Sequence, residues 1–317
     1  MKTLFRLASL TFLAFAARSS VWSHEIPQTN SLPSIKNMEE RQQNQQKVSN
    51  ELQEKRKSWE LLSAKEITNN YKTGVYKPFL DQLNNRYQKE MADNSSQLKQ
   101  MQSGFVAALK EHAKNTASAP KKSSMDEDLK KEMQTLNQQG IDKMLALTKN
   151  DPNLLISRVV KQLAEHSKTI IDDMEIIMTY DELMKDPSFA TIQDPFFQIE
   201  GEFQAKMLLL SQHPSDFNLT PDQVKKMAVV LVLDKLNKQL ALCEQKNNQA
   251  CVNRIKKLQA AYPNLEAFLQ NGQYIAFLDN GSLKPENQLE EKIVIILREQ
   301  QQQEKNVLQK YQEQNKQ

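Results

Sequence analysis

The two cysteines of the chain, Cys243 and Cys251, are the residues whose type and spacing most directly predict a chemical bond. In an oxidising compartment a lone pair so close in sequence is most simply a disulfide, here joining the end of one helix to the start of the next. The closed loop is short, so its chain-entropy contribution is about 2.5 kcal/mol. The sequence therefore predicts a Cys243 to Cys251 disulfide and no free thiol nucleophile.

The remaining sequence lacks the motifs that commonly mark catalytic or metal sites. There is no Gly-x-Ser-x-Gly elbow, no Gly-rich phosphate loop and no His-Glu-x-x-His, and the four histidines lack zinc-ligand spacing. The nearest titrating cluster is Glu165 and His166 with Asp172 and Asp173. His166 falls on the apolar face of its expected helix and Glu165 about 100 degrees away, so they do not converge. We predict no enzyme, no catalytic residue, no metal and no cofactor.

The first residues have the pattern of an export signal. Lys2 and Arg6 precede an apolar run from Leu7 to Ala17, which is shorter than the roughly 20 residues of a spanning helix. We expect a signal peptide over 1–23, cleaved after Ser23, with the region of Ala16 and Ala17 as the second choice. Its removal takes away three of the 42 basic residues and none of the 39 acidic ones, which balances the charges. The expected protein is secreted or periplasmic, with no nucleic-acid partner and no stable membrane insertion.

Composition and one long apolar stretch predict the fold class. With 6 Gly and 11 Pro in 317 residues, turn residues are too few for many strands, so we expect an all-α protein. Thr220, Pro221 and Gln223 have the types and spacing of a capping box. The run Met227–Leu233 that follows is apolar on every side, which is typical of a helix covered by others.

The N-terminal part, 24–114, is expected to form a long coiled-coil-like helical hairpin. Its two helices would cover 36–72 and 78–114, each about 50 Å long and antiparallel. Seam positions of the second helix are candidate interaction residues: Asn94, Leu98, Met101 and Phe105. Asn94 also begins a glycosylation sequon, and a glycan would be incompatible with burial in the seam.

A linker over 115–124 separates this hairpin from a compact helical bundle over 125–317. Within the bundle, Tyr262 and Pro263 are expected to end one helix. The ambiguous stretch 265–278 is expected to be a short helix ended by Gly272, with a β-hairpin as the alternative. The last helix should project as a polar tail, with Val307, Leu308 and Tyr311 as a second candidate interaction stripe.

These features predict an exported, non-enzymatic helical protein that binds other proteins through helical surfaces. Envelope or secretion-system components, chaperones and secreted effectors have this character, and a homo-oligomer is one form that such binding could take. The alternative is a helical carrier that encloses an apolar small ligand within 152–261, where Tyr180, Phe196, Phe197 and Phe203 could line a cavity.

Overall fold

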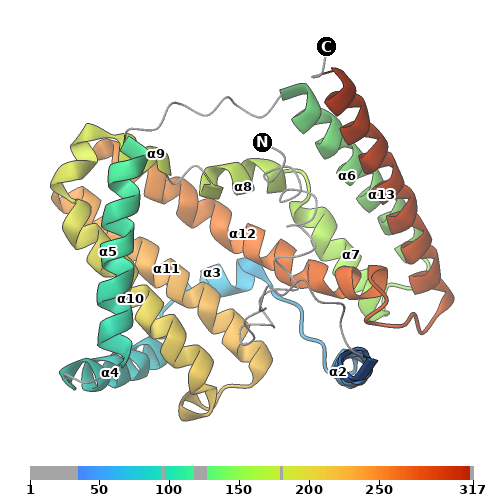
Figure 1. Cartoon of the computed structure of the whole chain (residues 1–317), viewed down its shortest axis with the longest axis horizontal. Coiled ribbons are helices and arrows are strands. Elements are labelled where there is room, and N and C mark those ends of the chain that lie inside the picture. The colour runs from blue at the N-terminus through green and yellow to red at the C-terminus, as the bar shows by residue number, and fades with distance from the viewer. Residues whose placement is uncertain (1–34, 94–96, 118–126, 179–180, 315–317) are drawn as a thin grey trace. The chain divides into compact units, whose positions relative to one another are not determined.

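The computed structural model describes residues 35–93, 97–117, 127–178 and 181–314, and every regular element within these ranges is a helix (Figure 1). This confirms the all-α prediction. The expected signal peptide 1–23, Asn94, residues 118–124 of the expected linker and Tyr180 of the carrier alternative lie outside the described residues.

The chain divides into two compact units, each made of segments distant in sequence. Unit 1 comprises 1–61, 124–169 and 267–317, and unit 2 comprises 62–123 and 170–266. Residues of the expected hairpin, 24–114, therefore fall in both units.

Unit 1 contains α2 (Ile35–Arg56), α6 (Glu127–Thr148), α7 (Leu155–His166), the second part of α12 (Gln249–Asp279) and α13 (Gln288–Gln314). Helices α6 and α13 lie side by side and run in opposite directions (Figure 1). Gln300 of α13 lies so close to Gly140 of α6 that a Cβ there would meet its side-chain amide. The C-terminal helix thus does not project from Gln300 onward as expected, because α6 offers it a packing surface.

Unit 2 contains α3 (Ala64–Lys72), α4 (Lys77–Ala92), α5 (Gln97–Ala117), α8 (Ile170–Met178), α9 (Asp181–Lys185), α10 (Gln193–Gln212), α11 (Pro221–Gln245) and the first part of α12, with two short 3₁₀ turns. Helix α10 packs against both α5 and α11 (Figure 1). The core includes Phe189, Phe196 and Phe197, whose rings meet edge to face. Both cysteines are buried there and form the expected disulfide, with their Cα atoms 5.7 Å apart.

The start of α11 agrees with the capping prediction. Thr220 accepts a hydrogen bond from the Gln223 backbone, and the Gln223 side chain accepts one from the Thr220 backbone. The expected apolar run is also buried, and Val229, Val230 and Leu231 are among its covered members.

Three expected helix lengths are wrong. The helix over 36–72 is two helices, because α2 ends at the buried Arg56 and Ser63 caps a new helix by accepting from the Glu66 backbone. The helix over 78–114 is divided into α4 and α5, with Asp93 extended after α4. Conversely, α12 does not stop before Pro263 but continues to Asp279.

Two sites in unit 2, Gly201 and the Tyr71 hydroxyl, have properties that depend on how closely the helices pack. A Cβ on Gly201 of α10 would lie 2.7 Å from Cγ2 of Val106, so a side chain there would have to displace its neighbours, whereas Gly104 of α5 has open space. Burial raises the pKa of the Tyr71 hydroxyl to about 12, and the nearby Asp234 carboxylate acts in the same direction. Both sites therefore report on helix packing.

None of the described helices is both long enough and apolar enough to cross a membrane.

Candidate functional site

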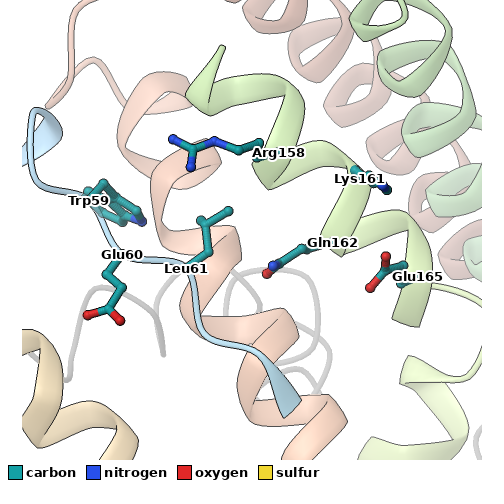
Figure 2. Close-up of a pocket in the computed structure, with 7 residues that line it drawn as sticks. All are labelled: Trp59, Glu60, Leu61, Arg158, Lys161, Gln162 and Glu165. Atoms are coloured by element: carbon teal, nitrogen blue, oxygen red, sulfur yellow. The ribbon is translucent and has the colours of Figure 1, made fainter. Parts of the chain in front are cut away.

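Unit 1 contains an open groove, which we call the Trp59 groove. One wall is residues Trp59, Glu60 and Leu61, which follow α2; the other is one face of α7 (Figure 2). The α7 side chains that line it are Arg158, Lys161, Gln162 and Glu165. Its volume of about 410 Å³ lies within the range of ligand-binding sites, although it is open rather than enclosed.

The α7 wall follows directly from helical periodicity. Positions 158, 161, 162 and 165 are three or four residues apart and so share one face. The opposite face carries Ile156, Val159, Val160 and Leu163, which are all buried in unit 1. Burial of the apolar face therefore fixes which polar side chains the helix presents to the groove.

Trp59 is held in place by aromatic packing against α12. Its ring meets Tyr274 edge on at a centroid distance of 5.2 Å and Phe277 at 6.2 Å. The Lys55 ammonium lies 5.7 Å from the indole centroid. The side chain is half-buried, so the indole keeps one defined orientation while part of it remains accessible.

The backbone next to Trp59 is anchored by Arg56, whose side chain is 5% exposed. Arg56 forms an ion pair with the buried Glu290, a second with Glu286 at 3.1 Å, and donates to the Lys284 carbonyl at 2.7 Å. The Tyr274 hydroxyl donates to the other carboxylate oxygen of Glu290 at 2.9 Å. Burial raises the pKa of Tyr274, which keeps this donor protonated. The end of α2 is therefore fixed to α12 and α13.

The Gln162 side chain, which lines the groove, is held in place by a hydrogen bond from helix α12. Asn271 of α12 is 2% exposed and donates a hydrogen bond to the side-chain oxygen of Gln162. Gln162 is half-buried, whereas Arg158, Lys161 and Glu165 are exposed. The groove thus combines an ordered floor with charged side chains that water or a ligand can reach.

The charges are unevenly placed along the groove. Figure 2 shows Arg158 reaching from α7 toward Trp59 and the Leu61 side chain directed toward α7, whereas Glu60 points away from α7. Lys161 and Glu165 lie farther along the helix. The charged groups that lie toward the indole, the Lys55 ammonium at 5.7 Å from its centroid and the Arg158 guanidinium, are both positive, which suits an apolar group next to an anionic one.

A second charged cluster lies between α10 and α11 in unit 2. Lys206, whose side chain is 4% exposed, donates to Asn84 and Glu202, while Lys235 pairs with Glu200 at 3.0 Å. Burial lowers the pKa of Lys206, although Glu202 opposes the change. The adjoining cavity is only about 10 Å³, too small for a ligand, so we interpret this cluster as helix-to-helix pairing.

The sequence-predicted interaction residues lie in two separate units. Leu98 is buried in unit 2, and Met101 and Phe105 are half-buried on the same helix, α5. The second set, Val307, Leu308 and Tyr311, is half-buried on α13 of unit 1. His166 is half-buried at the end of α7. Among the described residues, no group of three or more His, Cys, Asp or Glu side chains could hold a metal ion.

The Trp59 groove does not follow from the sequence pattern, because the helix expected over 36–72 runs straight through Trp59. A signal was present: Trp59 is one of two tryptophans in the chain, and Ser63 after it has the type and spacing of a helix cap. A large aromatic just before a new helix indicates a packed turn.

Comparison with known proteins gives no relative, since no family model, no curated protein and no solved structure matches this chain. The functional argument therefore depends on the residues of the chain itself.

Proposed function

We propose that the chain is an exported, non-enzymatic helical protein that binds a partner protein through the Trp59 groove. The observation that carries this proposal is a half-exposed tryptophan in a fixed orientation, with an exposed arginine facing it across an open groove. Tryptophan and arginine are the residue types that most often dominate binding energy at protein interfaces. Because the indole is already ordered, binding it costs little conformational entropy.

The dimensions favour a short extended segment of the partner. From Arg158 to Glu165 the helix advances about 10 Å along its axis at roughly 1.5 Å per residue. An extended chain rises about 3.3 Å per residue, so about three residues of a partner fit alongside. Such a segment would cover the Trp59 wall and the α7 face together.

Export is part of the proposal and is supported by two features. The first residues have the signal-peptide pattern described above, and both chain cysteines are joined in a buried disulfide. Mass spectrometry of the protein from its producer should give a chain that starts at His24. A chain that retains residues 1–23 would contradict this part of the proposal.

The carrier alternative gains no support from the rings on which it depended. Phe196 and Phe197 are fully buried and pack edge to face with Phe189, so they fill the core of unit 2. Phe203 is half-buried and lies under the Lys235 ammonium at 4.7 Å from the ring centroid.

Binding is tested by placing a photo-crosslinking amino acid at Leu61 in the producing cell, then purifying the crosslinked partner and titrating it by calorimetry. Trp59→Ala should weaken the affinity at least about 30-fold, as expected for a hot-spot residue worth about 2 kcal/mol. Val75→Ala, in which an exposed apolar side chain of unit 2 is removed, is the matched control and should leave the affinity unchanged. Equal affinities for the wild type and Trp59→Ala would overturn the proposal.

A further inference from the structure

We propose that the Trp59 groove selects an extended acidic segment, in which Arg158 binds an aspartate or glutamate side chain and Trp59 contacts the adjacent apolar residue. This inference rests on the proposed function and names the chemistry of the partner. Its occupant is a segment of another protein with one carboxylate beside an apolar residue.

The apolar half of the site is formed by Trp59 and Leu61, which both line the groove. Figure 2 shows Leu61 toward α7 and the Glu60 side chain directed away from it. The side chains that this wall presents to the groove are thus mainly apolar, although its sequence contains a carboxylate.

The anionic half of the site follows from Arg158. A guanidinium matches a carboxylate with two parallel hydrogen bonds, and such charge-assisted bonds are stronger than neutral ones. Arg158 is exposed, reaches toward Trp59 and lies one helical turn from Lys161, which adds a second positive charge. A carboxylate held by Arg158 would have its neighbouring residue next to the indole.

The far end of the groove limits how many acids the segment can carry. Glu165 lies about 10 Å beyond Arg158 along α7, at the distance of about three extended residues. Lys161 lies between the two and can pair with a second acid, whereas a third acidic side chain in the same segment would approach the Glu165 carboxylate and be repelled. The site should therefore prefer a segment with one or two acids to a longer run of acids, unlike a simple basic patch.

The experiment uses the mature chain from His24, in which Trp59 is the one tryptophan, so its emission reports on the groove. The probes are short N-acetylated, C-amidated peptides with a leucine, aspartate, leucine centre and glycine and serine flanks. The comparison peptides replace the aspartate by asparagine, or replace all three central residues by aspartate. Circular dichroism first confirms that each protein variant is folded.

At low salt the single-aspartate peptide should bind about tenfold more tightly than its asparagine counterpart, and more tightly than the triple-aspartate peptide. Arg158→Gln should bring the aspartate and asparagine peptides to similar affinities, while Arg298→Gln, which removes an exposed arginine of α13, should leave the preference intact.

Equal binding of the aspartate and asparagine peptides by the wild type, tighter binding of the triple-aspartate peptide, or no saturable emission change with any peptide would overturn the inference. The proposed function fails separately, through an unchanged partner affinity of Trp59→Ala. A partner that needs Trp59 while the peptides show no acid preference would leave the function standing and remove the selectivity.

Discussion

Replacing Arg56 by methionine should strongly destabilise unit 1. The side chain is 5% exposed, its partner Glu290 is 3% exposed, and the two form an ion pair that Tyr274 extends through its own hydrogen bond to Glu290. Methionine retains much of the arginine stem but leaves the Glu290 charge buried without its cation. The Lys284 carbonyl also loses the donor that lies 2.7 Å away.

The magnitude follows from the cost of an uncompensated buried charge. Removing one member of a buried pair costs about 3–5 kcal/mol, a large part of the roughly 5–15 kcal/mol that stabilises a typical domain. With a urea slope near 2 kcal/mol per molar, the midpoint should fall by roughly 2 M. Replacing Glu290 by leucine in the same chain removes the unpaired buried charge. The free energy of unfolding of the double variant should therefore fall by much less than the sum of the decreases in the two single variants.

The assay is urea unfolding of the mature chain from His24, followed by the emission of Trp59, its one tryptophan. Trp59 packs on Tyr274 beside this ion pair, so its emission reports on unit 1 even where the two units unfold separately. Lys57→Met is the matched control, because Lys57 forms an exposed pair with Glu54 at 3.1 Å. Exposed pairs of this kind contribute about 0–1 kcal/mol.

The reasoning is refuted if Arg56→Met lowers the free energy of unfolding by no more than Lys57→Met does. It is equally refuted if the losses from Arg56→Met and Glu290→Leu simply add, because the two charges would then act independently.

Three further predictions concern unit 2. Gly201→Ala should lower the free energy of unfolding by about 1–2 kcal/mol through overpacking, whereas Gly104→Ala should raise it by up to about 1 kcal/mol through helix propensity; circular dichroism in urea measures both, and equal effects would contradict the packing. The pKa of Tyr71 is raised to about 12 in the folded state, so its stabilisation is complete below pH 10 and lost as the pH rises through about 12. Tyr71→Phe should therefore make unfolding less pH-dependent in that window, and an unchanged slope would count against the burial of Tyr71. Replacing Cys243 and Cys251 together by alanine should cost about 2–4 kcal/mol, and a loss below 1 kcal/mol would indicate that the disulfide contributes little.

Local chemistry explains which parts of the fold were predictable from the sequence. The α11 cap could be read because Thr220, Pro221 and Gln223 act within one helical turn. The disulfide could be read because the chain contains just two cysteines, close in sequence. Scarce glycine and proline similarly indicated the all-α class.

The errors arose where distant residues decide the outcome. The end of α2 depends on Arg56 meeting Glu290, which is over two hundred positions away, and no local pattern indicates this. Helix α12 passes through Pro263, where local rules predict an end, because it is buried on both sides of that residue, as at Ala261 and Leu265. The Trp59 groove was missed for the same reason, since its two walls come from separate segments that tertiary packing brings together.

The central claim, binding through the Trp59 groove, is tested most directly by hydrogen–deuterium exchange of the full chain with and without its crosslink-identified partner. Residues 57–61 should exchange more slowly in the complex, because a bound segment would cover this non-helical wall. Slower exchange confined to α5, or to α13 around Val307 and Tyr311, with 57–61 unchanged, would contradict the claim. That result would instead favour the surfaces predicted from the sequence alone.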